Sequence, residues 1–137
     1  MQTGSGKFGL LQLPVVLDAR GTLTAIEGQR HIPFEIARVY YLYDVPDGKG
    51  RGGHAHRELQ QLLIAVSGSI TVRADNGTVS ESFVINRPNQ GLYLGQKVWR
   101  ELSRFSADAV CLVLASDIYE ESDYIRDYDQ FVRENSV

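Results

Sequence analysis

The sequence is poor in cysteine and has no excess of positive charge. A single cysteine, Cys111, among 137 residues excludes an intrachain disulfide. It stands in the apolar run Ala-Val-Cys-Leu-Val-Leu, which predicts a small buried side chain rather than a reactive thiol. The net charge of −3 argues against DNA or RNA as a partner, because proteins that bind phosphate polymers are usually basic. A small anionic ligand is still compatible, since it needs only one or two local arginines.

Long apolar runs are also missing. No stretch approaches the roughly 18 apolar residues that cross a membrane, and the first residues lack the pattern of a signal peptide. We therefore expect a cytoplasmic protein that has no membrane partner. The length is typical of one domain, and 43% hydrophobic residues are enough to bury a core. We expect residues 1–137 to form a single domain.

Short apolar segments separated by turn residues follow one another along most of the chain. The clearest is 34–43, which is rich in aromatic and β-branched residues, and Asp75-Asn-Gly-Thr is typical of a tight hairpin. The other predicted strands are 10–17 with a break at Pro14, 23–26, 54–56, 61–66, 70–73, 82–85, 91–94, 98–102 and 109–115. Turn signals every 8–12 residues or so predict an all-β sandwich or barrel.

The end of the sequence departs from this pattern. Tyr124, Ile125, Tyr128, Phe131 and Val132 are spaced like one face of a helix. Ser122 precedes them and is a suitable N-cap residue. We expect a short C-terminal helix, against which Tyr119, Tyr124 and Tyr128 pack.

Two of the three histidines, His54 and His56, stand together directly after a stretch with four glycines between residues 48 and 53. Side chains alternate along an extended chain, so both imidazoles project to the same side, roughly 6–7 Å apart. The glycines allow tight bends and close approach of a ligand. Such a pair suits a metal site or proton transfer, although buried histidines can also be purely structural.

The metal hypothesis is tested by the spacing. The stretch fits the frame of the first cupin motif, G-x5-H-x-H-x3,4-E-x6-G, at Gly48, His54, His56 and Gly68. However, Gln61 stands where that motif needs a glutamate. The second cupin motif supplies a histidine after a Pro-x-Gly turn, and here the segment after Pro88 offers Tyr93 instead. Two of four ligands are missing, so we expect neither a metal nor another cofactor.

Without a metal, the two histidines suit general acid–base catalysis near neutral pH. A base can remove a proton next to a carbonyl, and a second group can return one to the neighbouring carbon. The chemistry is then an isomerisation or an epimerisation through an enediol.

Arginines and aromatic residues supply candidate ligand contacts. Arg38 and Tyr40 share one face of the predicted strand 34–43. If that face points inward, Arg38 needs an anionic partner such as a phosphate, and Tyr40 can bind a sugar or stabilise an enolate. If it points outward, Arg38 belongs to a solvated or dimer surface. Further phosphate candidates are Arg20, Arg51 and Arg100. Trp99 could stack on a base, although a single tryptophan in a β protein is more often part of the core.

Several of these residues lie in segments that resemble a known enzyme family. The stretch Phe34-Glu-Ile-Ala-Arg-Val-Tyr-Tyr-Leu-Tyr-Asp-Val-Pro, followed by Arg51-Gly-Gly-His-Ala-His-Arg-Glu-Leu-Gln-Gln, resembles the sugar-nucleotide 3,4-ketoisomerases. These enzymes act on dTDP-4-keto-6-deoxyglucose and belong to the metal-free cupins. Asp18-Ala-Arg-Gly and the tail Ala115-Ser-Asp-Ile-Tyr-Glu-Glu-Ser-Asp-Tyr are also similar. The resemblance extends over about residues 16–131.

The resemblance implies a cupin or jelly-roll barrel that forms a homodimer, and it leaves open whether N-terminal strands are exchanged. It implies that His54 and His56 move protons between C-3 and C-4, with His54 as the base at C-3. It implies that Arg20, Arg38, Tyr40 and Arg100 hold the dTDP-sugar. The product would be a dTDP-3-keto-6-deoxyhexose, which an aminotransferase converts into an amino sugar for lipopolysaccharide or another glycan.

Three alternatives stay open at this point. Related metal-free cupins include 3,5-epimerases of the same substrate, which typically use a histidine–aspartate pair in a different setting. A non-catalytic sugar-nucleotide sensor would keep Arg38 but would not need two titrating histidines. A dioxygenase cupin would need bound iron.

Overall fold

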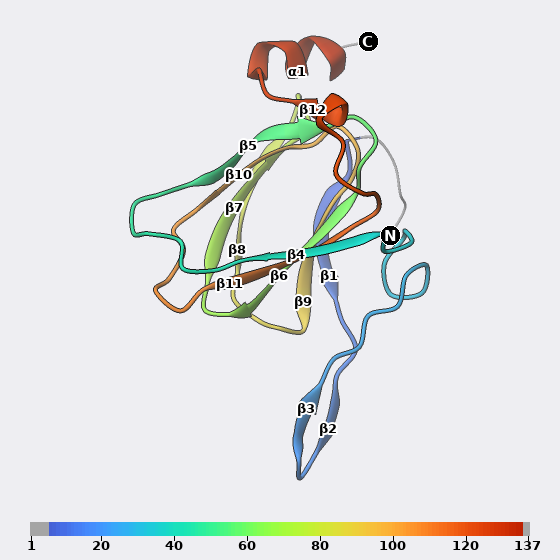
Figure 1. The fold of residues 1–137 in the computed structure, drawn as a ribbon, viewed down its shortest axis with the longest axis vertical. Coiled ribbons are helices and arrows are strands. Elements are labelled where there is room, and N and C mark those ends of the chain that lie inside the picture. Colours follow the sequence, from blue (N-terminus) through green and yellow to red (C-terminus); the bar gives the residue numbers. More distant parts are fainter. Residues whose placement is uncertain (1–5, 136–137) are drawn as a thin grey trace.

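Two five-stranded antiparallel sheets face each other in the computed structural model, which describes residues 6–135 (Figure 1). The first sheet has the order β1-β9-β6-β11-β4, with β1 Phe8–Gln12, β9 Gln90–Leu94, β6 Gln61–Ser67, β11 Val110–Ala115 and β4 Arg38–Leu42. The second has the order β12-β5-β10-β7-β8, with β12 Tyr124–Ile125, β5 Arg51–His56, β10 Trp99–Ser103, β7 Ile70–Asp75 and β8 Ser80–Ile85. The predicted all-β, jelly-roll fold is therefore confirmed.

The core lies between the inner faces of the two sheets. Alternate residues point inward, such as Leu63 and Ala65 on β6 and Val72 and Ala74 on β7. Each large aliphatic side chain buried in this way stabilises the fold by roughly 1.5–3 kcal/mol. Cys111 belongs to this core, and burial raises the pKa of its thiol to about 12. The interpretation of Cys111 as a small apolar filler is confirmed.

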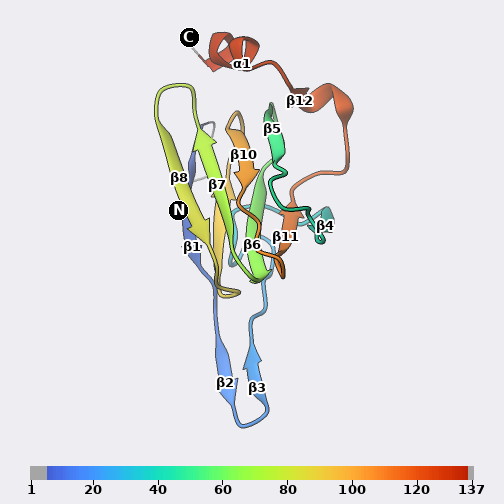
Figure 2. The ribbon, with the colours of Figure 1, turned by 90° about the vertical axis from the view of Figure 1, so that its left-hand side faces the viewer.

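A small hairpin projects from the molecule, at the end opposite the C-terminal helix α1 (Figures 1 and 2). It consists of β2 (Val16–Asp18) and β3 (Gly21–Leu23), which pair only with each other. Val16, Leu17 and Leu23 are 56%, 74% and 58% exposed, so this hairpin leaves apolar surface uncovered in a single chain. Near it, a 440 Å³ groove with mostly apolar walls runs over the outer face of β6 and β11.

The predicted strands match the observed ones to within a few residues, except at 34–43. There the strand begins only at Arg38, because Phe34 packs in a second core cluster on the outer face of the first sheet. Leu13, Ile32, Leu62 and Leu114 belong to the same cluster. Burial against this cluster outweighs the β propensity of residues 34–37.

The tail differs from the prediction at its start. Tyr124 and Ile125 form β12, which pairs with His56 and Ala55 of β5, and Ser122 lies in a 3-10 turn, Glu121–Asp123. The helix α1 is Tyr128–Asn135. Its first turn is capped by the Asp127 side chain, which accepts a 2.9 Å hydrogen bond from the Asp129 backbone N–H, so the N-cap prediction at Ser122 was wrong. Within residues 6–135, no helix is long and apolar enough to cross a membrane.

Candidate active site

Glycine shapes the strand that carries both histidines. Gly52 has a φ of +90°, and a Cβ there would lie 2.9 Å from the carbonyl oxygen of Arg100 on β10. The register between β5 and β10 shifts at the same point, between Arg100 and Glu101. The bend lets β5 pass close to β10 and sets His54 directly opposite Arg100.

The two imidazoles lie side by side, as the spacing predicts. Their ring centroids are 4.9 Å apart and the rings are nearly perpendicular. His54 lines a 60 Å³ cavity between the sheets, together with Tyr40, Arg51, Gln61 and Arg100 among others. His56 is only 2% exposed and does not line this cavity; its Nδ1 is 3.5 Å from Oδ2 of Asp123. The two histidines therefore hold different positions, one on the cavity wall and one behind it.

Hydrogen bonds join three further side chains that line this cavity, Arg100 beside His54 on the second sheet and Gln61 and Tyr40 on the first. Arg100, 3% exposed, donates from Nη1 to Oε1 of Gln61, and it donates twice to the carbonyl of Val98, at 3.3 and 3.2 Å. Gln61 donates from Nε2 to the Tyr40 hydroxyl at 3.1 Å. The neutral amide thus joins a buried cation to a phenol.

This arrangement does not fit a divalent metal. The guanidinium of Arg100 is bound to the side chain at the position where the cupin motif requires an anionic ligand. In the part of the chain that the structure describes, no three His, Cys, Asp or Glu side chains gather as metal ligands.

Arg38 points to the inner side of β4, next to Tyr40. Its Cζ lies 5.3 Å from the ring centre of Tyr40 and 5.7 Å from that of Tyr119. Its Nε is buried and has no hydrogen-bond partner among residues 6–135. A buried guanidinium donor of this kind calls for an acceptor, which an anionic ligand can supply.

Burial and positive neighbours keep both histidines neutral at pH 7. Burial, and then the charge of Arg100, lowers the pKa of His54 to about 4 and that of His56 to about 2. Burial raises the pKa of Tyr40, so its hydroxyl stays protonated. The cavity therefore offers a neutral proton acceptor beside a neutral hydroxyl and a buried cation.

Tyr124 is the site residue that the sequence interpretation missed. Its ring centre is 4.9 Å from that of His54 and 4.4 Å from that of His56. Tyr119 packs against Tyr124 with 5.6 Å between the ring centres. The prediction that both pack against the tail helix was wrong, because β12 turns Tyr124 toward the histidines, while Tyr119 lies against Tyr124 and Arg38. The one sequence signal that could have pointed to Tyr124 was the similarity of residues 115–124 to the tail of the sugar-nucleotide 3,4-ketoisomerases.

The predicted structural roles of Tyr128 and Trp99 are confirmed. Tyr128 lies on α1 and packs on Trp99 and Phe131, with ring centres 5.2 and 5.7 Å apart. Trp99 is 5% exposed and its Nε1 donates to Glu101, so it belongs to the core rather than to a base-stacking surface.

Two predicted phosphate ligands lie further out. Arg51 lies on the rim of the cavity and is exposed. Arg20 lies on the projecting hairpin, with a side chain that is 90% exposed and paired with Asp18 at 2.7 Å. The hairpin and β5 extend from different ends of the sheets, so Arg20 does not reach the histidines of its own chain (Figure 1).

Comparison with known proteins decides the family. The family model described as "FdtA: WxcM-like, C-terminal" matches residues 7–136. The chain belongs to this family. The TDP-4-oxo-6-deoxy-alpha-D-glucose-3,4-oxoisomerase of Aneurinibacillus thermoaerophilus is 47% identical over 116 residues, which cover 85% of this chain and 84% of that protein. The predicted resemblance to the 3,4-ketoisomerases is thereby confirmed.

Solved structures of 3,4-ketoisomerases have the same fold. A 3,4-ketoisomerase from Helicobacter canadensis superposes with a TM-score of 0.91 and 46% identity, over 95% of this chain and 98% of that one. A histidine-to-asparagine mutant of the 3,4-ketoisomerase QdtA from Thermoanaerobacterium thermosaccharolyticum was solved in complex with TDP-4-keto-6-deoxyglucose. It superposes with a TM-score of 0.90 and 41% identity, over 93% of each chain.

Proposed function

We propose that this protein is a sugar-nucleotide 3,4-ketoisomerase that converts dTDP-4-keto-6-deoxyglucose into a dTDP-3-keto-6-deoxyhexose. The observation that carries the proposal is the neutral His54 opposite the buried Arg100 in one cavity. The Aneurinibacillus relative is named for this reaction, and the QdtA mutant was solved with this substrate. These relatives favour the ketoisomerase over an epimerase.

The cavity supplies the first step of the reaction. His54 takes the proton at C-3, and the electron pair of that C–H bond forms a C-3 to C-4 double bond while O-4 becomes negative. Arg100 has five N–H donors and uses three of them on Gln61 and Val98, so others can stabilise the charge on O-4. The Tyr40 hydroxyl lines the same cavity from the other sheet and is a second donor.

The arginines around the cavity suit the pyrophosphate of the substrate. The Nε of Arg38 is buried without a partner among the described residues, and Arg51 lies on the rim. A pyrophosphate oxygen at Arg38 would satisfy this donor and bring a negative charge close to the histidines.

Arg20 can serve this site only in a homodimer. The hairpin that carries it exposes apolar side chains, and a second copy would cover them. We propose that the hairpin of one protomer lies against the other and brings Arg20 to the edge of the other cavity.

Proton NMR of dTDP-4-keto-6-deoxyglucose with EDTA-treated protein in D2O tests the function. We expect a 3-keto isomer with solvent deuterium at C-4, and the coupling constant at C-4 gives its configuration. Deuterium at C-3 and C-5 with the ketone still at C-4 would mean an epimerase. Saturable binding without any change would mean a sensor.

The His54→Asn variant tests the assignment of the base. We expect it to bind dTDP as the wild type does and to lose most of its turnover, by about 10²–10⁴-fold. Weakened binding with unchanged turnover of the bound complex would contradict this role.

A further inference from the structure

The cavity that holds His54 is lined on one side by polar groups and on the other by aliphatic side chains. The aliphatic side chains have no hydrogen-bonding group and come from four strands: Leu42, Leu63, Leu102 and Val113. We call these four residues the aliphatic wall. Three of them belong to the buried core between the sheets, and Leu42 packs against that core. A ligand group placed against the aliphatic wall therefore meets no donor or acceptor side chain.

The lining changes from polar to aliphatic within one inward-facing step on each of three strands. The pairs, with the polar residue first, are Tyr40 and Leu42 on β4, Gln61 and Leu63 on β6, and Arg100 and Leu102 on β10. Residues two apart on a strand point to the same face and are about 7 Å apart. On β11, Val113 is paired with both Tyr40 and Leu63. The cavity therefore consists of a polar layer with an aliphatic layer directly beside it.

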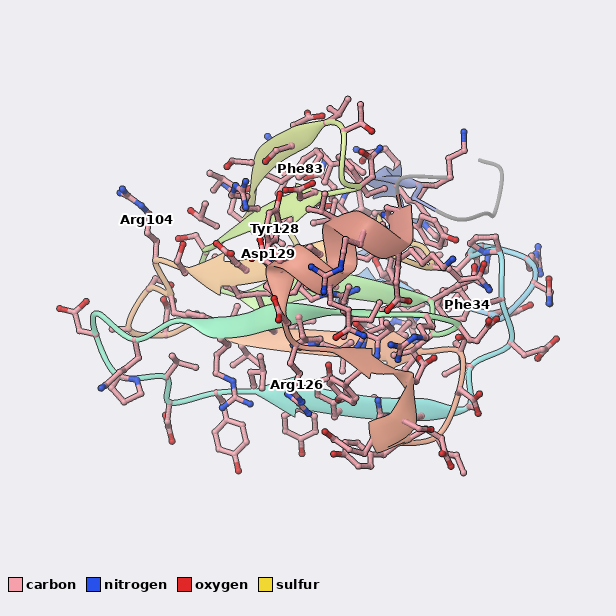
Figure 3. The ribbon with its side chains drawn as sticks, turned by 90° about the horizontal axis from the view of Figure 1, so that it is seen from above. Phe34, Phe83, Arg104, Arg126, Tyr128 and Asp129 are labelled. Carbon is pink, nitrogen blue, oxygen red and sulfur yellow. The ribbon has the colours of Figure 1, made fainter. Side chains whose placement is uncertain are left out.

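The arginines near the outer end of the aliphatic wall do not make it polar. Arg104, which follows β10, has a φ of +52°, is exposed and points away from the sheets (Figure 3). Arg51 is opposite Leu102 in the register and is exposed on the rim of the cavity. Both guanidinium groups are therefore hydrated, and the four side chains between the sheets keep an apolar surface.

The proposed substrate has one apolar substituent on its sugar ring, the C-6 methyl group. This carbon is two bonds from C-4, so it lies close to the layer in which His54 and Arg100 act on C-3 and C-4. The cavity measures 60 Å³, against roughly 300 Å³ or more for common ligand pockets, so the reacting end of the sugar is closely enclosed. A methyl group is stabilised by burial against aliphatic side chains, whereas the C-2 hydroxyl would lose its hydrogen bonds there.

We propose that the aliphatic wall is the subsite for the C-6 methyl group and makes the enzyme specific for 6-deoxy sugars over their 6-hydroxy counterparts. This inference rests on the proposed function and deepens it, because it assigns the residues that select the substrate class. A hydroxyl on C-6 would lie against the wall without a partner. The expected discrimination is about 10–100-fold, which is typical of an added hydroxyl in an apolar pocket.

Two stable nucleotide sugars that differ by one oxygen atom test the subsite. They are dTDP-6-deoxyglucose and dTDP-glucose, and neither has the C-4 ketone, so their dissociation constants report recognition without turnover. We expect the wild type to bind the 6-deoxy sugar about 10–100-fold more tightly in titration calorimetry. Equal affinities would overturn the inference. If neither sugar nor TDP binds, the proposed function fails, and the inference fails with it.

The Val113→Thr variant tests whether the aliphatic wall is the source of the preference. Threonine is close to valine in volume and adds a hydroxyl that can bond the C-6 hydroxyl of dTDP-glucose, so the preference should narrow by about tenfold. The matched control is Val72→Thr, which is buried in the same core on β7 but does not line the cavity. It should keep the wild-type ratio of affinities. An unchanged ratio in Val113→Thr, or the same narrowing in both variants, would contradict the proposal.

A second measurement needs no variant and covers the case in which Val113→Thr does not fold. Wild-type protein with carbon-13-labelled leucine and valine methyl groups is mixed with dTDP-6-deoxyglucose. We expect nuclear Overhauser effects between the C-6 methyl protons and labelled methyl groups of the aliphatic wall. Contacts only with the ring protons of Tyr40 or His54 would place the methyl group in the polar layer and overturn the inference.

Discussion

Gln61 illustrates how one side chain changes the chemistry of a site. An amide can donate to Tyr40 and accept from Arg100 at the same time, whereas a carboxylate can only accept. The amide also leaves the charge of Arg100 unneutralised. That charge is the second cause, after burial, of the lowered pKa values of both histidines.

The Gln61→Glu variant should therefore shift the pH dependence of activity. A carboxylate next to Arg100 offsets its charge and raises the pKa of His54 above about 4. Because the neutral imidazole is the base, activity falls as the pH drops through this pKa, so the acid limb of kcat/KM should move to higher pH. Gln60→Glu is the control, since Oε1 of Gln60 accepts from the Tyr93 hydroxyl and lies off the cavity. If the acid limb of kcat/KM were the same in both variants, the charge of Arg100 would not control the pKa of His54.

His56 should make the fold sensitive to acid. Its pKa is about 2 in the folded protein, against an ordinary value of 6.5 in the unfolded chain. Above pH 6.5 neither state binds the proton; below it the unfolded state does, so stability is lost as the pH falls from 6.5 toward 2. At pH 5 the loss is about 2 kcal/mol. Urea unfolding at pH 8 and pH 5 should show a smaller difference for His56→Gln than for the wild type, and an equal difference would refute the shift.

At the scale of elements, the sheets were predictable and the tail was not. Alternating apolar residues and glycine turns are local signals, so nearly all strands of the two sheets were found in sequence. The helical spacing from Tyr124 to Val132 is also real, but only Tyr128 onward follows it. Pairing of Tyr124 and Ile125 with β5 is a contact across almost 70 residues of chain, which no local pattern reports.

The same difference between local patterns and long-range pairing separates the site residues that were predicted from the one that was missed. His54, His56, Arg38 and Tyr40 stand on two strands whose alternation gives their direction. Tyr124 enters the site only through a distant strand pairing. The loss of a metal ligand at Gln61 was visible in sequence, but its hydrogen bonds to Arg100 and Tyr40 were not, since they join three different strands.

The bend in β5 gives a prediction at this scale. A methyl group at residue 52 would be strained by the φ of +90° and would lie 2.9 Å from a backbone oxygen. Gly52→Ala should therefore lower the free energy of unfolding by about 1–3 kcal/mol and reduce turnover, because His54 would move relative to Arg100. Gly53→Ala is the matched control: its φ is +73°, but a Cβ there meets nothing within 4 Å. Denaturant unfolding should show a larger loss of unfolding free energy for Gly52→Ala than for Gly53→Ala. Equal losses would mean that the contact with β10 is unimportant.

At the scale of the molecule, the proposed homodimer, with Arg20 on the exposed hairpin, would share its two sites between the protomers. Arg20→Ala and His54→Asn should each be nearly inactive alone. If Arg20 of one protomer completes the site of the other, a re-equilibrated equimolar mixture should recover about a quarter of wild-type activity, because half the dimers then hold one intact site. Activity measurements before and after mixing check this. A mixture that stays inactive would place Arg20 outside the shared site.

The anchoring of β12 also has a consequence for how the protein is made. Both sheets except β12 are encoded before residue 116, whereas Asp123 and Tyr124, which lie against the histidines, are encoded after it. Arg57 further ties β5 to Glu134 on α1 through two hydrogen bonds of 3.1 and 3.0 Å. A nascent chain on the ribosome can therefore assemble most of its sheets while its histidine pair is still uncovered. The site closes only when the segment that carries β12 and α1 has been translated and has docked.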